Sequence, residues 1–224
     1  MSIGSVYEKA YKGDFNQVKV KIDEDKTLAV TPDENNRLLI HWAALGGNEN
    51  LVDYLLDCGS PVDPVDDTNA TPLILAASAG RYEVVRLLIG KKANVNHKTS
   101  RHQTSLHYAS SKGHKEVVKI LINVDANVNI PDVLGATALH RASAQGRSDI
   151  VEILLNSKHI KVDAIDSTKC TPLYLACEED REIVASMLIK AGAQVDIRNK
   201  EGNTALDISS PKLKKLILTL INKS

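Results

Sequence analysis

Large aromatic side chains are scarce in this sequence of 224 residues. They make up 4% of it, with one Phe and one Trp, although 43% of the residues are hydrophobic. A globular core of this size usually contains more large rings, whereas a fold of thin stacked layers can be filled by Leu, Val, Ile and Ala. The scarcity therefore favours a layered repeat architecture over one thick core.

An excess of charge of either sign is also missing. Lys and Arg number 28, and Asp and Glu number 28. Because no global basic field supports binding to DNA or RNA, we expect no binding of nucleic acid. We also expect the protein to be a monomer.

Three more absences concern the chain's surroundings. Cys58, Cys170 and Cys177 form no C-x-x-C pair, which is typical of structural thiols in a reducing compartment. The N-terminus shows no basic start followed by an apolar run, so we expect no signal peptide. No apolar stretch approaches the roughly 18 residues that a membrane span needs. We therefore expect an intracellular protein with no membrane contact.

An internal repeat dominates the sequence that remains. T-x-L triplets recur at steps of 33, 33, 34 and 33 residues, beginning at Thr71, Thr104, Thr137, Thr171 and Thr204. A degenerate block in the same register occupies residues 38–41. The motif T-P-L-H-x-A at this period is the signature of the ankyrin repeat. The sequence thus predicts an all-α repeat protein, an ankyrin-repeat solenoid of about seven repeats, each a helix-turn-helix with a β-hairpin-like tip.

The repeats account for the whole chain, which predicts a single domain over residues 1–224. Residues 1–36 form an N-terminal capping repeat, residues 37–203 form five central repeats, and residues 204–224 form a C-terminal capping repeat. Small residues in the first helices and bulky ones in the second helices predict a concave face lined by first helices and tips. The extra residue of the 34-residue step is expected in a loop within residues 156–161.

Histidines recur at the fourth motif position, as His41, His107 and His140. They could be general bases or metal ligands, but successive repeats are about 10 Å apart, so they could share no metal or substrate atom. We favour a structural role, in which each imidazole bonds to the motif Thr or to the turn backbone. Nucleotide-binding glycine motifs and a nucleophile elbow are also missing. We expect no enzyme activity, no catalytic residue, no cofactor and no metal.

A row of large side chains follows the fourth motif position. It consists of Trp42, Leu75, Tyr108, Arg141 and Leu175. Aromatic and Arg anchors in one row are typical of the centre of a protein interface, although such side chains could also simply cover the small residues beneath them. Charges of both signs surround the row, namely Arg37, Asp66, Asp67, Arg101, Lys112, Lys169, Glu178, Glu179 and Asp180. The mixture suits a protein partner and suits DNA poorly.

Leu175, Cys177 and Glu179 match L-x-C-x-E, a short motif by which some proteins engage retinoblastoma-type pocket proteins. These residues also occupy ordinary first-helix positions. Since the motif binds as an extended strand, its use here would require local unfolding.

The departures of individual repeats from the motif carry a resemblance to one family. They lie in residues 41–43, 106–112, 139–142, 175–179 and 199–201. On the basis of these departures, the whole length of the chain resembles the gankyrin family. This family comprises the ankyrin-repeat non-ATPase subunits associated with the 26S proteasome. Ala70 departs from the family, because a tip Trp is expected there, and Ile74 replaces the motif His.

The resemblance implies an assembly chaperone of the proteasome regulatory particle, located in the cytoplasm and nucleus. Such a protein holds the C-terminal domain of one base ATPase subunit in its concave face. Positions that match family contacts are Arg37, Asp67, Lys112 and Glu179, with His41, Trp42 and Arg141 beside them. Animal members are also linked to a cyclin-dependent kinase and to pocket proteins, so the alternative functions are regulation of such a partner or a generic signalling scaffold.

Overall fold

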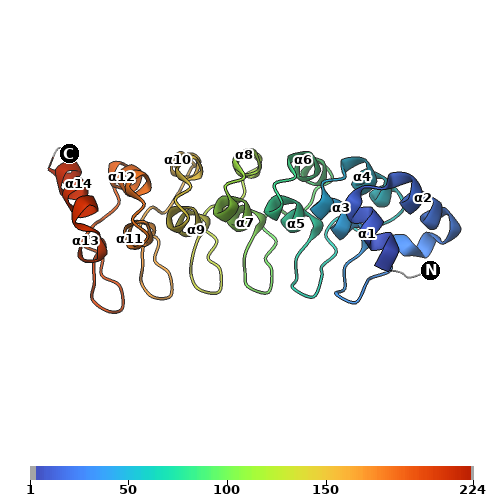
Figure 1. Ribbon diagram of the computed structural model, residues 1–224, viewed down its shortest axis with the longest axis horizontal. Coiled ribbons are helices and arrows are strands. Elements are labelled where there is room, and N and C mark those ends of the chain that lie inside the picture. Colours follow the sequence, from blue (N-terminus) through green and yellow to red (C-terminus); the bar gives the residue numbers. More distant parts are fainter. Residues whose placement is uncertain (1–3, 223–224) are drawn as a thin grey trace. The chain divides into compact units, whose positions relative to one another are not determined.

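The computed structural model describes residues 4–222, which fold into short helices joined by turns, with no strand among them (Figure 1). The helices are α1 (Gly4–Lys12), α2 (Phe15–Glu24), the 3₁₀ helix η1 (Lys26–Ala29), α3 (Leu39–Gly46), α4 (Glu49–Asp57), α5 (Pro72–Ser78), α6 (Tyr82–Gly90), α7 (Ser105–Lys112), α8 (Lys115–Asn123), α9 (Ala138–Ala144), α10 (Ser148–Leu155), α11 (Pro172–Glu178), α12 (Glu182–Lys190), α13 (Ala205–Ile208) and α14 (Pro211–Ile221). Successive α-helices pair into helix-turn-helix repeats, which confirms the predicted fold class.

The contacts within the chain divide it into two compact units, residues 1–109 and 110–224. In the first unit α3 packs between α1 and α5, and α4 packs against α6. In the second unit α11 packs between α9 and α13, and α12 packs between α10 and α14. Each unit therefore has a layer of first helices and a layer of second helices. The single domain over residues 1–224 that the sequence predicts stays a prediction.

Residue size explains the two layers. Small side chains such as Ala43, Ala76 and Ala176 are fully buried in the first helices and let their backbones approach closely. Branched side chains such as Val84 and Ile150 are fully buried in the second helices. Because this core consists of aliphatic side chains, few aromatic residues are needed.

The motif threonine determines where a first helix begins. Thr171 Oγ1 accepts a hydrogen bond from the Tyr174 N–H at 3.1 Å, and Thr71 caps α5 in the same way. Pro72 and Pro172 start their helices, where a missing N–H costs nothing.

The motif histidines are part of this framework. His140 Nδ1 accepts from the Thr137 N–H at 3.1 Å, and its Nε2 lies 3.1 Å from the Cys170 carbonyl oxygen of the next tip. His41 and His107 are buried with equivalent bonds at Nδ1. These contacts confirm the predicted structural role, in which each imidazole bonds to the motif Thr or to the turn backbone.

An arginine at the start of a second helix ties one repeat to the one before it. Arg181 Nε donates to the Ala144 carbonyl oxygen at 3.1 Å and crosses over Gly146. Gly146 has φ +68, and a Cβ there would lie 2.9 Å from Arg181 Cδ. Glycine is required at this position by its backbone conformation and by the close approach.

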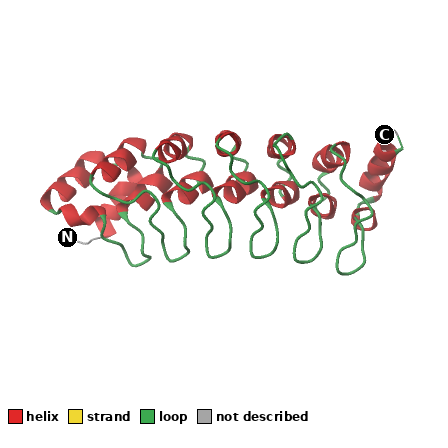
Figure 2. Cartoon of the chain, turned by 180° about the vertical axis from the view of Figure 1, so that it is seen from behind, coloured by secondary structure: helices red, strands yellow, loops and turns green. Residues whose placement is uncertain are grey.

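The tips are hairpin-like turns, as predicted, and in each unit they extend from the first-helix layer (Figure 2). Two backbone bonds close such a turn, for example from Asp132 N to the Ala136 oxygen and from Gly135 N to the Asp132 oxygen, each at 2.9 Å. Neighbouring tips are also joined, since Ser167 N donates to the Leu134 oxygen at 2.7 Å. The extra residue of the 34-residue step lies in the turn after α10, which ends at Leu155, as predicted.

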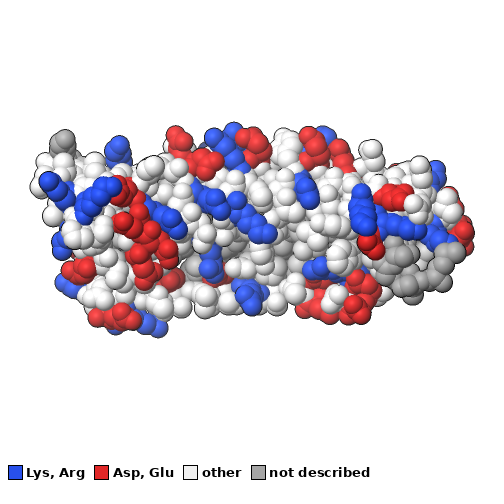
Figure 3. Space-filling model, in the orientation of Figure 1, with Lys and Arg blue, Asp and Glu red and all other residues white. Residues whose placement is uncertain are grey.

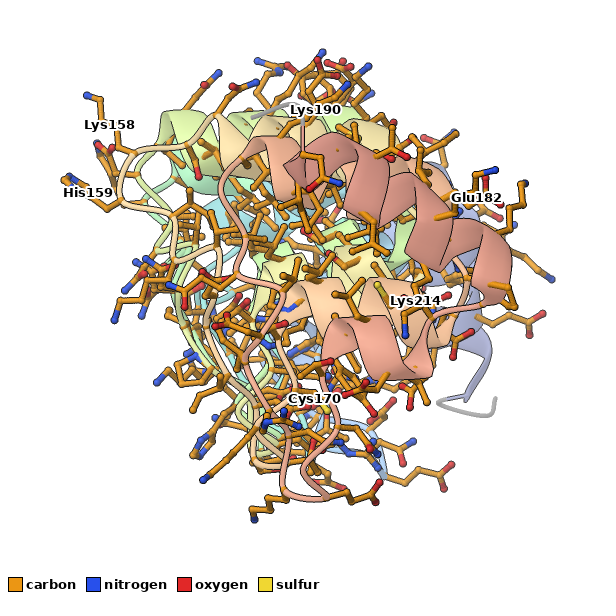
Figure 4. The ribbon with its side chains drawn as sticks, turned by 90° about the vertical axis from the view of Figure 1, so that its left-hand side faces the viewer. Lys158, His159, Cys170, Glu182, Lys190 and Lys214 are labelled. Carbon is orange, nitrogen blue, oxygen red and sulfur yellow. The ribbon has the colours of Figure 1, made fainter. Side chains whose placement is uncertain are left out.

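The helix α14 covers the end of the second unit. Leu213 and Ile217 are fully buried, and Lys212 forms an ion pair with Glu182 of α12. Figure 4 shows Glu182 and Lys190 at the level of the second helices and Cys170 among the tips. No helix within residues 4–222 combines the length and the hydrophobicity that crossing a bilayer requires.

Candidate protein-interaction surface

Half-buried side chains line the first helices of the first unit. Trp42 of α3, Leu75 of α5 and Tyr108 of α7 form what we call the N-terminal row. Each of the three residues is half-buried, so part of it remains accessible to solvent. The row therefore offers apolar area to a partner while it protects the small residues beneath.

Three neighbours hold the Trp42 side chain. Its Nε1–H donates to Asp33 Oδ2 at 2.9 Å. The Arg37 guanidinium lies 5.1 Å from the centre of the indole ring, and the Tyr11 ring meets it edge-on with 6.4 Å between ring centres. A cation over an indole face and an edge-on aromatic pair are both favourable geometries. Trp42 is thus oriented before any partner arrives.

Arg37 is itself held by a buried carboxylate. Its Nε donates to Asp66 Oδ2 at 2.9 Å, and the Asp66 side chain is only 1% exposed. Burial alone would raise the pKa of Asp66, but hydrogen bonds from Thr68, Ala70 and Arg37 outweigh it and hold that pKa below its ordinary value. The ionised carboxylate keeps the guanidinium over Trp42.

The second unit has a shorter, more polar row. Arg141 of α9 and Leu175 of α11 form the C-terminal row, and both are half-buried. Arg141 Nη2 donates to Asp132 Oδ2, whose side chain is also 1% exposed. Burial would raise the pKa of Asp132, yet Arg141 and two backbone N–H groups lower it below its ordinary value. A buried tip aspartate thus binds an arginine in both units, although Arg37 comes from the preceding tip and Arg141 from the row itself.

Exposed charges accompany each row. Asp67 is exposed in the first unit, and Lys112, Glu178 and Glu179 are exposed in the second. Figure 3 shows acidic side chains gathered over the surface of α11 and α13. Glu178 ends α11 and Glu179 follows it, so the acidic groups stand three and four residues after Leu175. These groups can reach a partner directly.

Two residues predicted to contact a partner are buried instead. His41 is fully buried, because it closes the first turn of α3 through the Leu38 N–H and lies 3.1 Å from the Pro64 oxygen. Asp66 is buried because it closes a tip and binds Arg37. Both residues can influence binding only through the side chains that they hold.

The L-x-C-x-E residues lie in and just after the helix α11. Leu175 is half-buried, and Cys177 is 1% exposed in the packed layer. Burial raises the pKa of the Cys177 thiol, so it stays protonated and unreactive. An extended conformation of this segment would remove Cys177 from the core.

Three contributors to the surface were missed by sequence reasoning, namely Asp33, Asp132 and Tyr11. A signal for the two aspartates exists, because Asp33 and Asp132 stand nine residues before Trp42 and Arg141. A carboxylate nine residues before a tryptophan or arginine predicts a hydrogen bond between the two side chains, because the repeat places one in a tip and the other in the following first helix. No signal in the repeat pattern distinguishes Tyr11.

The described residues bring no three or more His, Cys, Asp or Glu side chains together in a way that could hold a metal ion. The polar groups of the surface form hydrogen bonds or ion pairs with one another, or they face solvent. Hydrogen bonding, charge pairing and apolar contact are therefore the chemistry that this surface can offer.

Comparison with known proteins agrees with this architecture. Residues 7–99 and 93–166 match the family model for ankyrin repeats in three copies, and residues 168–200 match the model for a single ankyrin repeat. The chain belongs to the ankyrin-repeat family, a family of protein-binding scaffolds. The ankyrin-repeat domain of human ASB11 superposes with a TM-score of 0.86 and 28% sequence identity over 98% of both chains.

Relatives of similar sequence include proteasome proteins. The 26S proteasome non-ATPase regulatory subunit 10 is 40% identical over 63 residues in the mouse and in the rat, and 39% identical over 63 residues in the human. This stretch covers 28% of the chain, 27% of the mouse and rat proteins and 28% of the human protein. The similarity confirms the resemblance to ankyrin-type proteasome subunits over that stretch.

Proposed function

We propose that this chain binds the C-terminal domain of a base ATPase subunit of the 26S proteasome and acts as an assembly chaperone of the regulatory particle. One observation carries the proposal. The two rows are apolar or cationic, their Trp42 and Arg141 side chains are already held by carboxylates, and exposed charges of both signs accompany them, in a chain similar to a proteasome regulatory subunit. A cytoplasmic and nuclear location is proposed together with this role.

The distribution of the contacts indicates the kind of partner. Within the first unit the row residues come from three first helices, α3, α5 and α7, so a short peptide could not engage them all. A folded helical surface could. Because the exposed charges have both signs, a partner docked in the reverse direction would bring like charges together. The charges therefore select orientation, and the rows supply most of the contact area.

Charge reversal in both units tests the proposal. The double variant Asp67→Lys with Glu179→Lys is expected to weaken binding of the isolated ATPase C-terminal domain at least about tenfold at low salt, measured by calorimetry. The control Asp57→Lys with Glu152→Lys makes the same change of charge on the second helices, where both side chains are exposed. The control should bind like the unmodified protein.

Two results would count against the proposal. Equal weakening by both double variants would mean that total charge, and not the row surface, controls binding. If the unmodified protein fails to bind the ATPase domain at all, the proteasomal function is wrong, and a lowered activity of a cyclin-dependent kinase would then favour the regulatory alternative.

A further inference from the structure

Aspartates at the start of three tips use their two oxygens for different purposes. One oxygen closes the tip. Asp33 Oδ1 accepts the N–H groups of Asn35 and Arg37, each at 2.9 Å. Asp132 Oδ1 accepts those of Leu134 and Ala136, at 2.9 and 3.0 Å. Asp66 Oδ1 closes its own tip in the same manner.

The other oxygen reaches the interaction surface. Asp33 Oδ2 binds Trp42 Nε1, and Asp132 Oδ2 binds the Arg141 guanidinium. In both cases the row residue follows the aspartate by nine positions. Asp66 is followed at that spacing by Leu75, which has no polar group to offer, and its second oxygen binds Arg37 of the preceding tip instead.

We propose that Asp33 and Asp132 are positioning residues of the interaction surface, each using its second carboxylate oxygen to hold one row side chain in its binding orientation. The partner in this proposal is the ATPase domain, so that part rests on the proposed function. An indole or guanidinium that is already oriented loses less conformational entropy when a partner binds, so the partner binds with higher affinity.

Another tip of the chain shows that replacing the aspartate by asparagine would keep the tip closed while removing the acceptor that holds the row side chain. Asn199 occupies the same tip position, and its Oδ1 accepts the N–H groups of Glu201 and Asn203 at 3.0 and 2.9 Å. Its amide nitrogen donates to the Tyr174 hydroxyl at 3.1 Å. An asparagine therefore closes such a tip, but its second atom is a donor. In Asp33→Asn this donor would face the Trp42 N–H, which cannot accept a hydrogen bond.

Trp42 is the single tryptophan of the chain, so its fluorescence reports the first step without any partner. Acrylamide quenching of Asp33→Asn should be clearly stronger than that of the unmodified protein, because the indole moves more. The matched control is Asp166→Asn, which changes the same tip position where the row residue is Leu175. The control should leave quenching unchanged, and both variants should melt within about 2 °C of the unmodified protein.

Binding of the isolated ATPase C-terminal domain reports the second step. Loss of one hydrogen bond should raise the Kd of Asp33→Asn about three- to tenfold. In a Trp42→Phe background, where no indole N–H exists, Asp33→Asn should have no further effect. The pair Asp132→Asn and Arg141→Met should show the same non-additivity.

The outcomes separate this proposal from the proposed function. Unchanged Trp42 quenching in Asp33→Asn overturns the positioning role, even if the unmodified protein binds the ATPase domain. If Asp33→Asn loses as much affinity in the Trp42→Phe background as it does in the unmodified protein, the positioning role is also overturned. If the unmodified protein does not bind, the proposed function fails, and the quenching comparison by itself still decides whether Asp33 positions the indole.

Discussion

The N-terminal and C-terminal rows occupy the same repeat position but present different chemistry. In the first unit the row is apolar and aromatic, and Trp42 is held by a carboxylate, a guanidinium and a second ring. In the second unit the row contains Arg141 and Leu175, and exposed carboxylates follow at the end of α11. One repeat position can therefore provide an apolar anchor in one place and a charge in another.

The difference suggests a division of roles at a protein interface. Buried aromatic anchors contribute most to affinity, whereas exposed charges mainly influence the association rate and the choice of orientation. We expect the first unit to contribute more affinity and the second unit to contribute more selectivity. Three predictions can contradict or refine this comparison.

The largest effect is expected from the anchor. Trp42→Ala should weaken binding of the ATPase domain by about 2 kcal/mol or more, which is roughly 30-fold in Kd. Leu175→Ala, the equivalent change in the second unit, should cost about 1 kcal/mol. Calorimetry on both variants, with circular dichroism as the check of folding, makes the comparison. Equal losses would mean that the two rows contribute alike.

A smaller effect, on stability, is expected from the layer beneath the rows. His140 bonds to its own Thr137 and to the next tip, whereas the third repeat has the apolar Ile74 at this position. His140→Ala should lower the free energy of unfolding by about 1–3 kcal/mol, because it leaves buried polar groups without a partner. Ile74→Val should cost about 0.5–1.5 kcal/mol. Urea titration measures both values, and the folded fraction of either variant should still bind the partner.

If His140→Ala retains full stability but loses binding, the histidine is part of the interface and its structural role is wrong. The Ile74→Val control shows in the same assay how much a purely apolar position of this layer contributes.

Much of the fold could be predicted from sequence because each repeat is determined locally. The start of a first helix can be predicted from neighbouring residues alone. Thr171 caps α11 and Pro172 begins it, as expected. The positions of the two half-buried rows can also be read from the sequence, since Trp42 and Leu175 stand at one motif position. Local rules of this kind transfer from one repeat to the next.

What sequence reasoning could not predict depends on contacts between neighbouring tips. Asp66 and Asp67 are adjacent and chemically identical in sequence, yet Asp66 is buried and Asp67 is exposed. The difference arises because Asp66 closes its turn and binds Arg37, which lies 29 residues away. His41 is also buried, because one ring nitrogen binds the Leu38 N–H and the other lies against the Pro64 oxygen of the next tip. A list of charges near a row does not show which of them already have a partner.

The smallest expected effect is a dependence of stability on pH that both units share. Burial lowers the pKa of His41 in the first unit and of His140 in the second, so both are neutral in the folded protein. An unfolded histidine has a pKa of about 6.5 and takes up a proton below it. The unfolded state then binds more protons than the folded state, so stability falls as the pH drops through this range.

This loss should reach at most about 1.4 kcal/mol per histidine between pH 7.5 and pH 5.5. Asp66 and Asp132 should not contribute to it, because their lowered pKa values keep them ionised there and their stabilisation is lost only below about pH 4. Urea titrations of the unmodified protein, His41→Gln and His140→Gln at both pH values test the prediction. Each variant should remove the share of the loss that belongs to its own histidine, and an unchanged loss in both would show that other groups take up the protons. A loss removed by only one of them would show that the two units differ in their buried layer as well as in their rows.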